Sequence, residues 1–146
     1  MEMEGMKIET MKIGDNAGIP AVVWGEASDR VIIAVHGNLS NKADAPIRHL
    51  AVHALPRGYQ VLSFDLPEHG DRKEEPTPCK IQYCVEDLKV IMAYARSRWK
   101  KISLFANSMG AFFSLLTYPK EPIEKALFLS PVVDMMRVIE TVPSQW

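Results

Sequence analysis

The stretch that decides the fold is Phe105-Ala106-Asn107-Ser108-Met109-Gly110-Ala111. It joins residues 101–106, which have the apolar character of a strand, to residues 109–118, which have that of a helix. A serine in a sharp strand-to-helix turn is held in a strained backbone conformation, so small residues are needed two positions to either side, as at Ala106 and Gly110. Such a turn leaves Ser108 at a helix N-terminus, where developing negative charge is favoured. We expect Ser108 to be a nucleophile; the alternative is a serine that only caps the helix.

Outward from this turn, strand-like and helix-like segments alternate. Strands are expected at residues 6–13, 19–26, 30–36, 60–66, 101–106 and 125–130, and helices at residues 43–55, 81–99 and 109–118. The later strands are apolar almost throughout, which is typical of a parallel sheet covered by helices on both faces. The pattern therefore predicts an α/β fold with a doubly wound, mostly parallel sheet and antiparallel N-terminal strands.

Two further segments are expected at the carboxyl edge of this sheet, where ligands bind and reactions take place in such folds. They are Val35-His36-Gly37-Asn38-Leu39 and Phe64-Asp65-Leu66-Pro67-Glu68-His69-Gly70-Asp71-Arg72. Together with the stretch around Ser108, they resemble the α/β-hydrolase fold superfamily. The matching motifs are the nucleophile elbow G-x-S-x-G, with Ala106 for the first glycine, the H-G-x segment, and the D-x-P-G-H-G-x-S turn, with Glu68 for a glycine. The joint spacing of the three is far more specific than any one motif.

This resemblance implies a serine hydrolase similar to carboxylesterases, acylglycerol lipases and serine aminopeptidases, which cleaves an ester, thioester or amide by acyl transfer. It implies that the backbone N–H groups of Asn38 and Met109 form the oxyanion hole, and that no cofactor or metal takes part. It also implies that His36 is structural and holds its loop. Asp65 is expected to bond local backbone, with His69 as a general base kept as an alternative.

The catalytic acid and base are harder to place. In the family the triad runs Ser, then Asp or Glu, then His, whereas the histidines of this chain all precede Ser108: His36, His49, His53 and His69. Asp134 is a candidate acid, and the alternative is an Asp at a helix start. The family core has eight strands, so we expect residues 1–146 to be a single partial domain, truncated after the sixth strand, without the last two strands, the cap and the histidine loop. The alternative function is a catalytically incomplete fragment or pseudo-enzyme without turnover.

Composition and charge narrow the class of protein. The chain has 146 residues, 47% of them hydrophobic, and a net charge of -1, as in ordinary globular domains. Its Lys and Arg residues are scattered, which argues against nucleic acid as a partner. A nucleotide-binding domain is disfavoured because no G-x-G-x-x-G or G-x-x-x-x-G-K-[ST] motif follows a strand. No apolar run is long enough for a membrane span and no secretory signal is visible, so we expect a cytoplasmic protein.

Two features bear on redox state and assembly. Cys79 and Cys84 can form a disulfide, but we expect two reduced thiols, and no metal site because no Cys or His lies at ligand spacing. The sixth strand, residues 125–130, is apolar on both faces and is expected at a sheet edge. Self-association is therefore expected, either as a homodimer through this strand or as aggregate.

Overall fold

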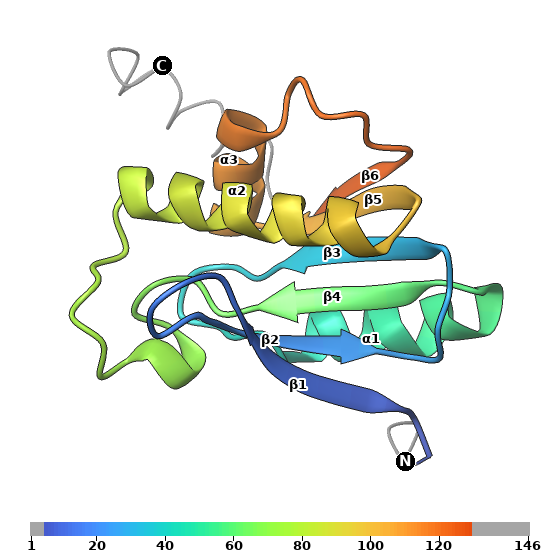
Figure 1. Ribbon diagram of the computed structural model, residues 1–146. Coiled ribbons are helices and arrows are strands. Elements are labelled where there is room, and N and C mark those ends of the chain that lie inside the picture. Colours follow the sequence, from blue (N-terminus) through green and yellow to red (C-terminus); the bar gives the residue numbers. More distant parts are fainter. Residues whose placement is uncertain (1–4, 130–146) are drawn as a thin grey trace.

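Six strands form one mixed sheet with helices on both faces (Figure 1), within residues 5–129, the part of the chain that the computed structural model describes. The strands are β1 (Ile8–Ile13), β2 (Ile19–Trp24), β3 (Arg30–Val35), β4 (Gln60–Phe64), β5 (Lys101–Asn107) and β6 (Ala126–Leu129). The helices are α1 (Ala45–Ala54), α2 (Ile81–Arg98) and α3 (Met109–Thr117), with 3-10 turns η1 (Leu55–Arg57) and η2 (Gly70–Arg72). The predicted strands and helices are all present.

The order of the strands across the sheet is β1-β2-β4-β3-β5-β6. β2 runs antiparallel to both β1 and β4, whereas the pairs β3 with β4, β3 with β5 and β5 with β6 are parallel. This confirms the predicted α/β-hydrolase architecture. The carboxyl ends of β3, β4 and β5 lie side by side, so the three segments singled out in the sequence follow neighbouring strands.

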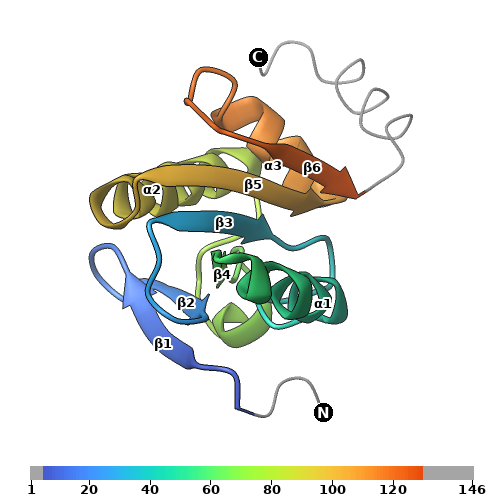
Figure 2. The same cartoon turned by 90° about the vertical axis from the view of Figure 1, so that its right-hand side faces the viewer.

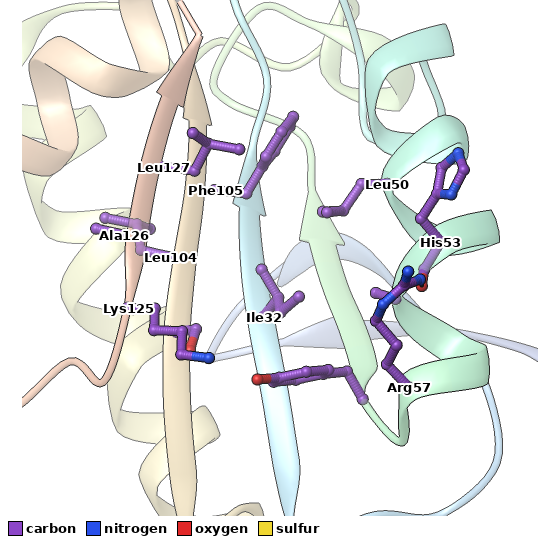
Figure 3. A pocket seen from close by; sticks show the side chains of 12 residues that line it. Ile32, Leu50, His53, Arg57, Leu104, Phe105, Lys125, Ala126 and Leu127 are labelled. Carbon is purple, nitrogen blue, oxygen red and sulfur yellow. The ribbon is translucent and has the colours of Figure 1, made fainter.

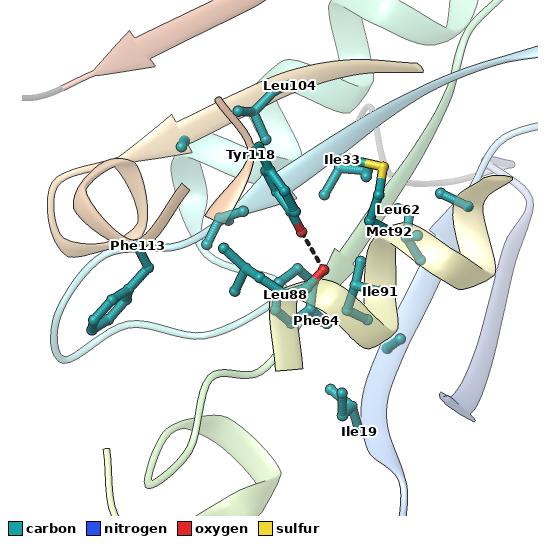
Figure 4. Close-up of a cluster of buried hydrophobic side chains, with 14 of the residues drawn as sticks. Ile19, Ile33, Leu62, Phe64, Leu88, Ile91, Met92, Leu104, Phe113 and Tyr118 are labelled. Carbon is teal, nitrogen blue, oxygen red and sulfur yellow. Dashed lines mark hydrogen bonds between the residues drawn. The ribbon is translucent and has the colours of Figure 1, made fainter. Parts of the chain in front are cut away.

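Two hydrophobic cores flank the sheet, one on each face. α2 and α3 cover one face and α1 covers the other (Figure 2). In the larger core, Leu88 and Ile91 of α2 pack against the strands, and the Tyr118 hydroxyl donates to the Leu88 carbonyl at 2.6 Å (Figure 4). Under α1, the buried Trp24 indole donates to Ser63 Oγ at 2.9 Å. The four inner strands β2, β3, β4 and β5 are thus largely buried on both faces, as their apolar sequences predict.

The helix ends differ from the expected ones for local reasons. α1 begins at Ala45 rather than at residue 43, because the Asp44 carboxylate accepts the Ile47 N–H at 2.9 Å as an N-cap. It ends at Ala54, where the chain tightens into η1 and turns at Gly58 with φ 88°. α2 ends at Arg98 because the next residue, Trp99, has extended backbone.

β6 lies at the outer edge of the sheet. It spans Ala126–Leu129, shorter than the expected strand at residues 125–130, and pairs within the described residues with β5 alone. Its side chains are poorly covered: Leu127 is 55% and Leu129 41% exposed in the described part of the chain. Asp134, the candidate acid, lies outside the described residues. In residues 5–129 no helix combines the length and apolar character that a membrane crossing needs.

Candidate active site

Ser108 lies in the turn between β5 and α3 with φ 53° and ψ -117°, a backbone conformation that costs a non-glycine residue about 1–3 kcal/mol. Its side chain is exposed, and its hydroxyl forms no hydrogen bond within the described residues. The Ser108 N–H is used in the sheet, where it donates to the Leu129 carbonyl at 3.0 Å. The structure therefore gives no support to a simple helix cap, because no capping bond is made.

Glycines allow the β3 loop to approach this turn closely. A Cβ on Gly110 would lie 2.5 Å from the His36 carbonyl oxygen and 2.7 Å from that of Val35. A Cβ on Gly37 would lie 3.1 Å from Ser108 Cβ. The buried Ala106 is the small residue on the other side of the turn. The turn and the β3 loop are thus in direct contact, as the expected elbow requires.

Asn38 and Met109 line the same pocket, a hollow of about 410 Å³ at this edge of the sheet. Met109 is the first residue of α3, and its N–H is one of the helix donors without an intrahelical partner. The Asn38 N–H also has no hydrogen-bond partner among the described residues. Two free backbone donors therefore border one pocket, and one of them belongs to Met109, the residue directly after Ser108.

His36 is fully buried and both of its ring nitrogens are engaged. Nδ1 pairs with the Gly37 carbonyl oxygen at 2.7 Å, and Nε2 accepts the Leu66 N–H at 3.0 Å. Because Nε2 accepts, the ring is neutral with its proton on Nδ1. Burial lowers the pKa of His36, which keeps it neutral. His36 therefore holds the loop after β3, as expected.

His69 forms the same kind of contacts from the loop after β4. Nδ1 pairs with the Pro67 carbonyl oxygen at 2.8 Å and Nε2 accepts the Leu39 N–H at 3.0 Å. Neither nitrogen is free to accept a proton from Ser108, so the alternative of His69 as a general base finds no support here. The remaining two histidines, His49 and His53, lie on α1 and meet edge to face with ring centroids 4.6 Å apart.

Asp65 is fully buried and organises the loop after β4. Its carboxylate accepts the Asp71 N–H at 2.9 Å, the local backbone bond that the sequence predicts. It also accepts the Lys42 N–H at 2.9 Å and pairs with Lys42 Nζ at 2.7 Å. Gly70, with φ 56°, leaves the space that the carboxylate fills. The sequence analysis missed Lys42, because nothing local links it to a residue 23 positions away.

Glu68 and Cys79 line the same pocket as Asn38. Glu68 has φ 68°, in the place where the family motif has glycine, and its carboxylate accepts the Cys79 N–H. Cys79 lines the pocket, and its thiol lies 3.7 Å from that of the buried Cys84. Both cysteines are free, and burial raises the pKa of both thiols. No group of His, Cys, Asp or Glu within residues 5–129 could hold a metal ion.

A second hollow, of about 460 Å³, lies on the α1 face of the sheet (Figure 3). Leu50 and His53 of α1 line it from one side, and Phe105 and Leu127 of the strands line the other. It is larger than the pocket that Asn38 and Met109 line, but among the predicted site residues that the structure describes, Ser108, Asn38 and Met109, none lines it. The predicted site residues Asn38 and Met109 line the smaller pocket instead.

Comparison with known proteins gives consistent results. A family model described as alpha/beta hydrolase fold matches residues 30–145. A serine hydrolase-like protein of Danio rerio is 28% identical over an alignment of 113 residues that covers 73% of this chain and 32% of that protein. The chain thus spans about a third of the length of this curated relative.

Solved structures share the fold at low sequence identity. An esterase of Pyrococcus furiosus has a TM-score of 0.71 at 21% identity, covering 95% of this chain and 57% of the esterase. A cold-adapted esterase from an Arctic intertidal metagenomic library has a TM-score of 0.66 at 21% identity, and the match covers 94% of this chain and 67% of that esterase. An epoxide hydrolase of Vigna radiata has a TM-score of 0.67 at 21% identity, and the match covers 86% of this chain and 38% of the epoxide hydrolase.

Proposed function

The chain belongs to the alpha/beta hydrolase fold family, and from this premise we propose that it carries the nucleophile and the oxyanion hole of a serine hydrolase that cleaves an ester, thioester or amide. The strained, exposed Ser108 at the start of α3 is the observation that carries the proposal. A strained nucleophile at a helix N-terminus is the arrangement expected of a nucleophile elbow.

In the proposed reaction, Ser108 Oγ attacks the carbonyl carbon of the substrate. The carbonyl oxygen takes up the negative charge and is held by the N–H groups of Asn38 and Met109, both free of partners among the described residues and both at the same pocket. Collapse of the tetrahedral intermediate breaks the bond to the leaving group, which takes up the proton that Ser108 Oγ gave off and departs as the alcohol, thiol or amine. The ester left on Ser108 is then hydrolysed by water, which releases the acid and returns a proton to Oγ. Each oxyanion donor of this kind contributes roughly 10²–10³-fold to the rate.

Similarity alone leaves ester and epoxide substrates open, because both esterases and an epoxide hydrolase share the fold. The nucleophile favours esters and related acyl compounds. A serine that opened an epoxide would become an ether, which water does not readily cleave, whereas an acylated serine hydrolyses. The chemistry of Ser108 therefore supports acyl transfer, and the similar esterases suggest small esters as substrates.

Neither histidine beside the site is placed to activate Ser108. Both histidines beside the site use both ring nitrogens in loop contacts. A serine hydroxyl without a hydrogen-bonded base is a poor nucleophile. Asp134, outside the described residues, remains our candidate acid. The second candidate function, favoured by the engaged histidines, is a catalytically incomplete protein without turnover.

The assembly proposal concerns β6. We propose that a second copy pairs with its outer edge, since that edge has no partner strand within residues 5–129 and Leu127 and Leu129 are exposed there. A homodimer across a two-fold axis would pair the outer edge of β6 and cover its exposed leucines at the same time.

The proposed function is tested with p-nitrophenyl acetate and the purified 146-residue chain. We expect slow transfer of the acetyl group to Ser108, located by peptide mass spectrometry, and steady-state turnover no faster than that of Ser108→Ala, because no base is bonded to Ser108 within residues 5–129. Fast turnover that depends on Ser108 would show that a base is present and would exclude the incomplete alternative. Acetylation elsewhere, with Ser108 unmodified, would contradict the proposal itself.

A further inference from the structure

The backbone on either side of Asn38 is held by two histidine rings. The first contact fixes the peptide between Gly37 and Asn38: its carbonyl oxygen accepts the His36 Nδ1–H at 2.7 Å. A trans peptide is planar, and its N–H points away from its C=O. Holding the Gly37 carbonyl against His36 therefore also fixes the direction of the Asn38 N–H, the proposed oxyanion donor.

The second contact fixes the next peptide, between Asn38 and Leu39. The Leu39 N–H donates to His69 Nε2 at 3.0 Å. Leu39 has φ 62°, a left-handed conformation that costs a residue with a Cβ roughly 1–2 kcal/mol. Its side chain is 90% exposed and so contributes little packing that could hold this conformation. The hydrogen bond to His69 thus holds the backbone at the bend after Asn38.

Each ring is anchored in the loop after β4 as well as in the loop after β3. His36 Nε2 accepts the Leu66 N–H at 3.0 Å, and His69 Nδ1 donates to the Pro67 carbonyl at 2.8 Å. The ring centroids lie 5.1 Å apart. The contacts are reciprocal, because each loop supplies one histidine whose Nε2 accepts a backbone N–H of the other loop. This two-histidine clasp ties both loops together beside Ser108.

We infer that His69 is a positioning residue for the oxyanion hole, which acts with His36 to hold both peptides flanking Asn38 so that its N–H stays unbonded at the pocket. This inference rests on the proposed function of the site. Hydrogen-bond donors that are held in place before the reaction need no rearrangement when the oxyanion forms. This preorganisation is what lets an oxyanion hole stabilise the transition state. Without His69, Leu39 can relax to negative φ, and the Asn38 N–H then loses its fixed direction.

Three variants test the inference. His69→Ala removes the acceptor, and His69→Gln keeps an acceptor oxygen near the place of Nε2. Gln60→Ala is the matched control, because Gln60 is a buried residue whose side chain bonds Gly25 and Trp99 at the opposite end of β4. It removes comparable buried hydrogen bonds without touching either loop.

The first measurement is amide hydrogen exchange by NMR, which needs no chemistry at Ser108. We expect exchange at Leu39 to be about tenfold faster in His69→Ala, to be largely restored in His69→Gln, and to be unchanged in Gln60→Ala, since a lost hydrogen bond exposes this amide locally. Unchanged exchange at Leu39 in His69→Ala would overturn the inference.

The second measurement is the rate at which a fluorophosphonate labels Ser108, because the phosphoryl oxygen of the probe needs the same donors. We expect a loss of about tenfold in His69→Ala, recovery in His69→Gln and no loss in Gln60→Ala. Faster exchange at Leu39 with unchanged labelling would show a clasp that does not position the donor, which also overturns the inference. A wild-type protein that is not labelled at Ser108 would instead refute the proposed function, and the inference with it.

Discussion

Gly110→Ala should destabilise the protein, although a change from glycine to alanine in a helix usually stabilises by about 0.5–1 kcal/mol. The added Cβ would lie 2.5 Å and 2.7 Å from the carbonyl oxygens of His36 and Val35, and 2.8 Å from Val35 Cγ1. Two of these three neighbours are backbone atoms at the end of β3, so the helix or the strand must shift. Overpacking of this kind costs about 1–3 kcal/mol. With the upper value, since backbone must move, the net loss is about 2 kcal/mol.

Thermal unfolding followed by circular dichroism measures this loss. A loss of about 2 kcal/mol corresponds to a fall in Tm of roughly 6 °C for a chain of this size. Gly37→Ala is the graded comparison, because its Cβ would meet Ser108 Cβ at 3.1 Å and Asn107 O at 3.2 Å, contacts that small shifts relieve. Its loss should stay below about 1 kcal/mol. A Gly110→Ala variant that melts at or above the wild-type temperature would refute the close approach of α3 to β3.

Three further outcomes follow from the titratable groups and from the sheet edge. Burial lowers the pKa of His36 below its ordinary 6.5, so the unfolded chain takes up a proton first as the pH falls. His36 should therefore leave the free energy of unfolding, measured with urea, unaffected above pH 6.5. Below pH 6.5 this free energy should fall by at most about 1.4 kcal/mol per pH unit, and His36→Gln should flatten this slope. If the slope is the same in His36→Gln, the pH dependence comes from other titratable groups. Burial raises the pKa of the Cys79 and Cys84 thiols, so a disulfide reagent at pH 7.5 should titrate them at least about tenfold more slowly in the native protein than in urea; equal rates would contradict their burial. Leu127→Lys should weaken self-association in light scattering across a dilution series, whereas Leu115→Lys, at an exposed leucine on α3, should not. A wild-type protein that stays monomeric throughout the series would refute pairing through β6.

The sequence was sufficient for the order and type of the elements, because their signals are local. The apolar stripe of α2 repeats every three or four residues, and its members Leu88, Ile91 and Ala95 are buried in the core. The small residues around Ser108 predicted a tight turn, and the structure has one there. Helix ends were less exact, since a single cap such as Asp44 moves a boundary by two residues.

The contacts between loops could not be predicted, because they join residues about 30 positions apart. The pairing of Leu39 with His69 depends on where two loops meet beyond the ends of β3 and β4. The same is true of Lys42 with Asp65. One signal was available: His36-Gly37 and His69-Gly70 are equivalent His-Gly pairs, each shortly after a strand of the same sheet. A repeated pair of this kind indicates a shared role, although its partners become visible only in three dimensions.

The central claim is that Ser108 is the nucleophile, and labelling with a fluorophosphonate probe tests it most directly. The wild-type chain should be labelled slowly at Ser108, as located by peptide mass spectrometry, because the strained hydroxyl is exposed beside two free N–H donors but has no base bonded to it within residues 5–129. Ser108→Ala should abolish labelling, whereas Ser97→Ala, which removes an exposed serine of α2, should leave it unchanged. Labelling that persists unchanged in Ser108→Ala would contradict the account.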